Sequence, residues 1–246
     1  MKKITALFLA VILILSLSAC SININTGGTE APSTADGTAA QSTEAQNTEA
    51  PATEVGTGAL SDYVKTAKEI KVTYGDSPYP VVLRMPEILL SGNDAAEANK
   101  EISDKFSKYM TESDAIGIND LDYAASLNGQ VLSVVIMSRF DGGNSYGLCY
   151  NFDVTTGGRL GNEAMCKLAG KDYIKGIGTL RKELKAYYDS RYANLPDNEA
   201  ERSKTLDDSN LHAASMYIDS SGKLMALVKT YAAVGGGQWI EQIKAE

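Results

Sequence analysis

The stretch 139–160, RFDGGNSYGLCYNFDVTTGGRL, alternates apolar and polar side chains between two pairs of glycines. One predicted face is apolar and aromatic and consists of Leu148, Tyr150, Phe152 and Val154. The opposite face consists of Cys149, Asn151 and Asp153. Alternation of this kind predicts a β-strand with one buried face, and the glycines permit the tight turns that end it. We expect the rest of the sheet to be organised around this strand.

Seven further runs of apolar, β-branched and aromatic residues also predict strands. With the first strand included, the predicted strands span residues 69–74, 79–85, 121–127, 131–140, 146–154, 213–218, 224–231 and 238–243. Asn128 and Gly129 predict a two-residue hairpin turn between the third and the fourth strand. The fourth strand contains the run VLSVVIM, which is apolar on both faces and predicts a place in the middle of the sheet.

Apolar residues recur at helical spacing in residues 94–110 and 172–192, and predict two helices. The apolar stripe of the first helix consists of Ala95, Ala98, Ile102, Phe106 and Tyr109. Its charged side consists of Glu97, Glu101, Asp104, Lys105 and Lys108. Spacings of four residues predict ion pairs on this side, which we interpret as a solvated face. Asp172 is the predicted cap of the second helix, and the polar residues 197–210 predict a loop.

The elements follow the order β-β-α-β-β-β-α-β-β-β. Runs of strands separated by two helices are typical of the α+β class. We therefore predict a mainly antiparallel sheet with two helices packed on one face.

The first 58 residues differ in composition from the rest of the chain. Lys2 and Lys3 precede an apolar run that is too short to span a membrane and that predicts a signal peptide over residues 1–19. The run ends in Leu-Ser-Ala-Cys, which resembles the lipobox of bacterial lipoproteins. This resemblance implies that Cys20 is acylated and anchors the mature protein to the cell membrane, on its extracytoplasmic side.

Residues 20–58 are rich in Thr, Ala, Ser and Glu and nearly free of large apolar side chains. Such a segment buries too little surface to offset the entropy of ordering it. We interpret it as a tether with a typical span of about 35 Å. Residues 59–246 are predicted to form a single domain.

The net charge of −8 argues against a nucleic-acid partner, because nucleic-acid-binding domains normally present a basic face. His212 is the one histidine of the chain, which excludes zinc sites with two histidine ligands. No nucleophile motif accompanies it, so we expect a structural or surface histidine. Asp120 and Asp122 would be the acids of a hydrolase that uses carboxylates alone. We expect no enzyme activity, no metal and no cofactor.

Cys149 and Cys166 are the cysteines that remain once Cys20 is assigned to the lipid anchor. An extracytoplasmic location permits a disulfide between them. The alternative is that both are small buried side chains.

Three stretches of the chain carry a resemblance to a known family. The first includes Pro86, Ala98, Asn99 and Ile102; the second includes Leu132, Ser133, Gly142, Gly143, Tyr150, Phe152, Asp153, Gly158 and Leu160; the third includes Tyr217, Ile218, Asp219, Gly222, Lys223, Leu224 and residues 235–237. The chain resembles the extracytoplasmic domain of lysozyme-sensing anti-sigma factors, which also occurs on the N-terminal side of certain peptidoglycan deacetylases. The family often has Ala-His after the glycine pair, where this chain has Asn144 and Ser145.

The resemblance implies a lipid-anchored binding module of the cell envelope, with a lysozyme-like protein or peptidoglycan as its ligand. The alternative is a structural or assembly lipoprotein without a soluble ligand. Binding residues tend to lie on exposed connections at the ends of elements. We therefore predict a ligand surface on the loop 141–146 and the facing segment 235–239, formed by Asp141, Asn144, Tyr146 and Trp239.

Overall fold

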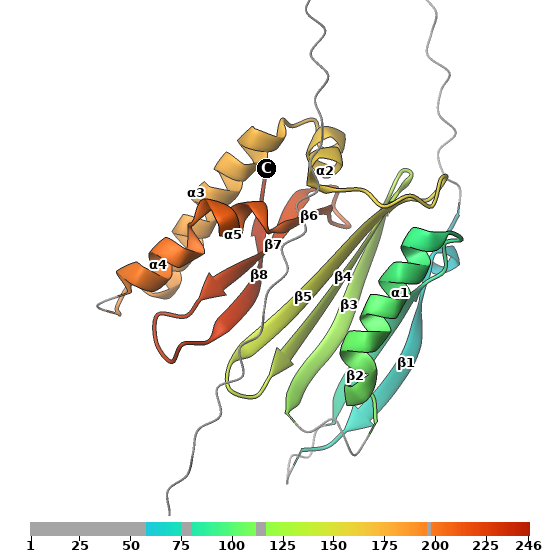
Figure 1. Ribbon diagram of the computed structural model, residues 1–246, viewed down its shortest axis with the longest axis horizontal. Helices are drawn as coiled ribbons and strands as arrows, with labels where there is room; N and C mark the ends of the chain where they lie inside the picture. The colour runs from blue at the N-terminus through green and yellow to red at the C-terminus, as the bar shows by residue number, and fades with distance from the viewer. Residues whose placement is uncertain (1–57, 75–79, 112–116, 196–197) are drawn as a thin grey trace, which may run out of the picture. The chain divides into compact units, whose positions relative to one another are not determined.

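A computed structural model describes residues 58–74, 80–111, 117–195 and 198–246. Within these ranges the chain forms eight strands and five α-helices, which Figure 1 colours from blue to red along the chain. The elements are β1 Val64–Val72, β2 Val81–Ile88, α1 Asn93–Phe106, β3 Ile118–Asn128, β4 Val131–Phe140, β5 Asn144–Asp153, α2 Asn162–Leu168, α3 Tyr173–Arg191, α4 Glu199–Thr205, α5 Asp208–His212, β6 Ser215–Ile218, β7 Leu224–Tyr231 and β8 Gln238–Lys244. The predicted signal peptide, Cys20 and nearly all of the predicted tether lie outside the described residues.

The predicted α+β class is confirmed, and every strand pair is antiparallel. The strands form three sheets, in the orders β1–β2, β3–β4–β5 and β6–β7–β8. β4 is the central strand of its sheet, as its two apolar faces predict. The hairpin turn is also confirmed, since Asn128 pairs with Val131 across it.

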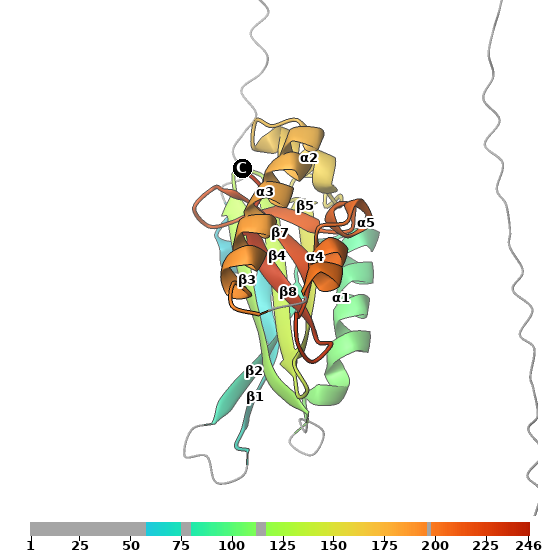
Figure 2. The same cartoon turned by 90° about the vertical axis from the view of Figure 1, so that its left-hand side faces the viewer.

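The expectation of one sheet with both helices on one face is wrong. Helix α1 packs with β1, β2 and the face of β4 that carries Leu132, Val134 and Ile136. Helix α3 packs instead with β6–β8, in a separate core. Val135, on the other face of β4, contacts Tyr217 and Leu227 of the β6–β8 sheet. The two faces of β4 therefore serve two different cores, and Figures 1 and 2 both show α1 and α3 well apart.

Strand β6 lies at an edge of its sheet, and polar side chains bind its outer edge. Ser126 Oγ donates to the carbonyl of Ile218 at 2.6 Å. Asn151 Nδ2 donates to the carbonyl of Met216 at 2.8 Å, and the N–H of Met216 donates to Asn162 Oδ1 at 2.8 Å. Buried backbone groups must find partners, and here side chains replace a neighbouring strand. The bonds of Ser126 and Asn151 join the β3–β5 sheet to the β6–β8 sheet, and that of Asn162 joins the start of α2 to β6.

The predicted loop over residues 197–210 is wrong in its central part, where α4 and α5 form. Asp207 begins α5, because its carboxylate accepts a hydrogen bond from the N–H of Ser209 at 2.8 Å. The predicted cap of the long helix is confirmed. Asp172 Oδ1 accepts from the N–H groups of Ile174 and Lys175, at 3.0 and 3.2 Å.

Alanine substitutions at two glycines of α3 are expected to have opposite effects on stability. A Cβ at the exposed Gly178 would meet no atom within 4 Å, whereas a Cβ at the buried Gly176 would lie 3.0 Å from Cys166 Sγ. Gly178→Ala is expected to raise the free energy of unfolding by about 0.5–1 kcal/mol, because alanine loses less backbone entropy in a helix. Gly176→Ala is expected to lower it by about 1 kcal/mol through overpacking. Urea denaturation measures both, and equal shifts in the same direction would contradict this packing.

Candidate functional site

The turn between β4 and β5 lies against the turn between β7 and β8. A Cβ at Gly237 would come within 2.8 Å of the carbonyl oxygen of Gly143, so the approach of the two backbones requires glycine. The N–H of Gln238 donates to Asn144 Oδ1 at 3.1 Å, and the N–H of Ile240 donates to Ser145 Oγ at 2.5 Å. The two segments that the sequence analysis paired are therefore neighbours.

Trp239 and Asn144 hold these turns together. The half-buried indole of Trp239 contacts the turn at Gly143, since a Cβ there would lie 3.3 Å from Cζ2. On its other side, the guanidinium of Arg191 lies 5.9 Å from the indole ring. Arg191 also donates to the Tyr187 hydroxyl at 2.6 Å. These contacts give Trp239 and Asn144 a structural part in the fold.

The side chains of Asp141 and Tyr146 take no part in these contacts between the turns. Asp141 is exposed, and its backbone N–H donates to the carbonyl of Gly117 at 3.0 Å. The pKa of the Tyr74 phenol is raised mainly by burial and to a lesser extent by the negative charge of Asp141. Tyr146 is on the same face of β5 as Tyr150, and Tyr150 packs in the α1 core. Tyr146 itself is 48% exposed. The four predicted residues therefore do not form one site.

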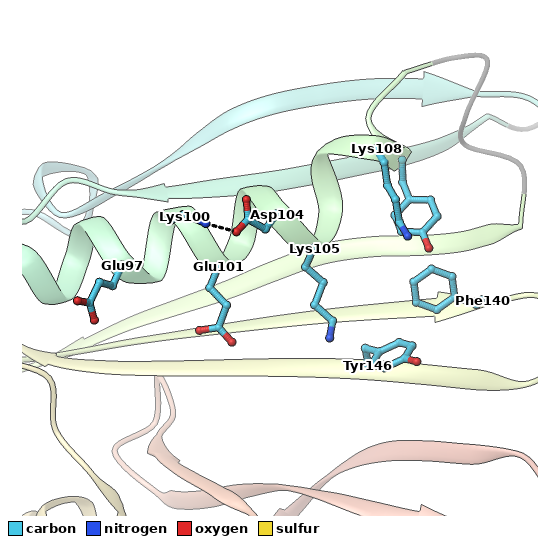
Figure 3. A pocket seen from close by; sticks show the side chains of 9 residues that line it. Glu97, Lys100, Glu101, Asp104, Lys105, Lys108, Phe140 and Tyr146 are labelled. Atoms are coloured by element: carbon cyan, nitrogen blue, oxygen red, sulfur yellow. Dashed lines mark hydrogen bonds and ion pairs between the residues drawn. The ribbon is translucent and has the colours of Figure 1, made fainter. Parts of the chain in front are cut away.

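Tyr146 lines a groove of about 580 Å³ between α1 and the ends of β4 and β5. Three aromatic rings form one end of it, those of Tyr109, Phe140 and Tyr146. Charged side chains form the rest. Five belong to α1 and one to the short 3₁₀ helix Ser107–Tyr109 that follows it, namely Glu97, Lys100, Glu101, Asp104, Lys105 and Lys108. Figure 3 shows Glu97, Glu101 and Lys105 projecting from α1 toward the strands, with Phe140 and Tyr146 at the far end. We name this the α1 groove.

The aromatic end of the α1 groove is an ordered series of rings. The centroids of Tyr109 and Phe140 are 5.2 Å apart, with an interplanar angle of 61°. Those of Phe140 and Tyr146 are 5.4 Å apart, at 87°. Such edge-to-face pairs stabilise each other by about 0.5–1.5 kcal/mol beyond the area they bury. The series holds the exposed Tyr146 ring in a fixed orientation.

Two lysines lie over these rings. Lys105 Nζ is 4.5 Å from the centroid of Tyr146, and Lys108 Nζ is 4.7 Å from that of Tyr109. Among the described residues neither lysine forms an ion pair, and the pairs predicted for them with Glu101 and Asp104 are absent. Asp104 pairs with Lys100 instead. The aromatic end therefore carries two positive charges that no carboxylate of the described residues compensates.

Below α1, Tyr150 is 1% exposed, and its hydroxyl lacks a hydrogen-bond partner among the residues that the structure describes. The pKa of Tyr150 is raised mainly by burial and to a lesser extent by the negative charge of Glu101. The phenol therefore stays neutral at physiological pH. Arg159 lies on the face of its ring, at 4.9 Å from the centroid.

The single histidine and the two aspartates of β3, the other residues considered for catalysis, do not form a site. His212 Nδ1 is 3.0 Å from the Tyr173 hydroxyl. Asp122 is 3.3 Å from Arg84, which also binds Glu69 at 3.0 Å. Neither Asp120 nor Asp122 lines the α1 groove. Within the described ranges, no group of three or more His, Cys, Asp or Glu side chains could hold a metal ion.

Cys149 and Cys166 are free thiols, so the predicted alternative of a disulfide is not formed. Strand β6 separates them. Cys166 Sγ is 3.2 Å from Met216 Sδ in the α3 core, whereas Cys149 Sγ lies 4.0 Å from the carbonyl of Met216, on the side of the β3–β5 sheet. Cys166 is fully buried, as the other alternative predicts, and Cys149 is half-buried.

Both thiols are expected to resist alkylation in the folded protein. Burial raises the pKa of Cys149 to about 12 and also raises that of Cys166, so both remain protonated at pH 8. Iodoacetamide should modify them about 100-fold or more slowly than in urea, where a thiol has its ordinary pKa of about 8.5. Peptide mapping after timed labelling measures both rates. Equal rates with and without urea would contradict the burial of these residues.

Most of the α1 groove was not expected from the sequence. Tyr109 was expected in the core stripe, and Lys105 and Lys108 were expected on a solvated face. No local pattern indicates the observed contacts. Lys105 covers the ring of Tyr146, which belongs to β5, and adjacent residues such as Lys108 and Tyr109 do not face each other on a regular helix.

Neither protein-family models nor curated protein sequences match this chain. Its resemblance to the lysozyme-sensing domain thus remains a prediction that rests on the quoted motifs. Among the helices that the structure describes, none has the length and apolar character needed to cross a membrane.

Proposed function

We propose that this chain is a lipid-anchored, extracytoplasmic binding module of the bacterial cell envelope that binds peptidoglycan in the α1 groove. The lipobox-like quartet that ends at Cys20 supports the anchor. The resemblance of residues 69–246 supports an envelope ligand. The α1 groove supports the location of the binding site.

The exposed ring of Tyr146 at the end of the groove is the observation on which this proposal depends. Sugar rings have apolar C–H faces that stack on aromatic rings and hydroxyl edges that bond to charged groups. The α1 groove offers both, with three rings and six charged side chains around about 580 Å³. Pockets of about 300–1,000 Å³ are usual for small ligands, and here one or two sugars with their substituents would fit.

A lysozyme-like protein is the second candidate ligand. The net charge of −8 favours a basic partner, because complementary charge accelerates capture. Binding of this kind would weaken as salt rises, because salt screens exposed charges.

The test is a retention experiment with the full-length protein in detergent. Insoluble peptidoglycan and bead-coupled lysozyme are offered separately, at low and at physiological salt. Retention by peptidoglycan at both salt concentrations is the expected result. Salt-sensitive retention by lysozyme alone would favour the second candidate and contradict the proposal. Retention by neither would also contradict it and leave a structural or assembly lipoprotein as the better account.

A further inference from the structure

We infer that Lys105 and Lys108 form a subsite for a carboxylate of the bound ligand, at the aromatic end of the α1 groove. This inference rests on the proposed function and adds the chemical class of the group that is recognised. Peptidoglycan fragments carry carboxylates on their peptide stems, close to the sugars. The subsite would bind such a carboxylate while the adjoining sugar lies against the part of Tyr146 that Lys105 leaves exposed.

Two of the three lysines of the α1 groove lack a carboxylate partner among the described residues. Lys100 also lines the groove, but its charge is compensated by Asp104 one turn along the helix. Lys105 and Lys108 have no such partner in the part of the chain that the structure describes. Their two ammonium groups, over neighbouring rings of one aromatic series, give this end of the groove the positive charge that a carboxylate would bind.

The two lysines are also already oriented. A free lysine loses rotamer entropy when it is fixed, which weakens most surface ion pairs. Here the rings of Tyr146 and Tyr109 hold the two ammonium groups at 4.5 and 4.7 Å from the ring centroids. Because a cation is attracted to the face of an aromatic ring, part of this entropy is lost before the ligand binds.

The rest of the groove differs in charge from its aromatic end. Glu97 and Glu101 line its other part, and neither forms an ion pair among the described residues. They would repel a carboxylate there and favour hydroxyl or ammonium donors of the ligand. Arg159 is near this part, over Tyr150, but it does not line the groove. The groove thus has one end suited to a negative group.

The test compares soluble disaccharide-peptide fragments of peptidoglycan with the same fragments after amidation of their carboxylates. Calorimetry with the full-length protein in detergent gives both dissociation constants. The wild type is expected to bind the amidated fragments about tenfold more weakly. The double variant Lys105→Met/Lys108→Met is expected to bind both forms equally, at the level of the amidated fragments.

Matched variants keep the test specific. Lys100→Met removes a lysine of the same groove whose charge is already compensated, and it should discriminate as the wild type does. Lys105→Arg/Lys108→Arg keeps both charges and should retain most of the discrimination, which excludes misfolding as the cause of its loss. Equal binding of both fragment forms by the wild type would overturn the carboxylate subsite alone. Binding of neither form by the wild type would contradict the proposed function as well.

Discussion

Replacing Asn151 with alanine is expected to lower the free energy of unfolding by about 3 kcal/mol. Asn151 is 5% exposed and forms two hydrogen bonds between elements. Its Nδ2 donates to the carbonyl of Met216 at 2.8 Å, and its Oδ1 accepts from Ser133 Oγ at 2.7 Å. Alanine would leave Ser133 Oγ without this partner and the carbonyl of Met216 with only the weak thiol donor of Cys149, 4.0 Å away. Each buried group that loses its partner costs about 1–3 kcal/mol.

Urea denaturation of the wild type and the Asn151→Ala variant measures this loss. Asn194→Ala is the matched control, because Asn194 is exposed and has no hydrogen bond among the residues that the structure describes. That substitution should change the free energy of unfolding by about 0.5 kcal/mol or less. Similar effects of the two substitutions would contradict the view that side chains on the β6 edge join the two sheets.

Replacing Tyr146 with alanine is expected to weaken retention by insoluble peptidoglycan more than tenfold, which corresponds to about 1.4 kcal/mol or more. The ring is 48% exposed at the end of the α1 groove, held by Phe140 and covered by Lys105. Its removal takes away the stacking surface and releases the ammonium group above it. Because the side chain is not in the core, the fold should remain intact.

Trp239→Ala is the informative comparison for this prediction. Trp239 and Tyr146 belong to the same predicted ligand surface, but the structure places Trp239 against Gly143 and Arg191. Its replacement should therefore lower stability and leave peptidoglycan retention nearly unchanged. Loss of retention with Trp239→Ala, and none with Tyr146→Ala, would move the site from the α1 groove to the glycine turns.

Local patterns predicted the strands well because they reflect local chemistry. The bounds of β4 and β7 match the predicted ranges, since alternating or continuous apolar runs end there at turn residues. The helices α2, α4 and α5 were missed because seven, seven and five residues are too few to show a helical period.

Division into separate sheets was not predictable from these patterns. Apolar residues on both faces of β4 indicate that each face is covered, but not by which element. The side chains of Asn151 and Ser126 that bind the β6 edge are also 65 and 92 residues from their partners. Nothing in a local pattern records contacts of that range.

The candidate site was predictable only in part, because local patterns indicate its turns but not the long-range contacts of its side chains. The glycines at 142–143 and 235–237 were expected on facing connections, and these two turns do meet. The charges of α1 were interpreted as i,i+4 pairs, yet Lys105 and Lys108 lie over rings that belong to β5 and to the end of the helix. Whether a surface lysine pairs with a carboxylate or a ring depends on which strand the helix covers.

Lysine footprinting tests most directly the claim that the α1 groove is the ligand site. The full-length protein in detergent is reductively methylated with and without saturating soluble peptidoglycan fragments, and each lysine is quantified by mass spectrometry. Labelling of Lys105 and Lys108 is predicted to fall severalfold in the bound protein, while Lys182, whose side chain is 83% exposed on α3, is labelled as before. Unchanged labelling of Lys105 and Lys108 in protein that has bound the fragments would contradict the account.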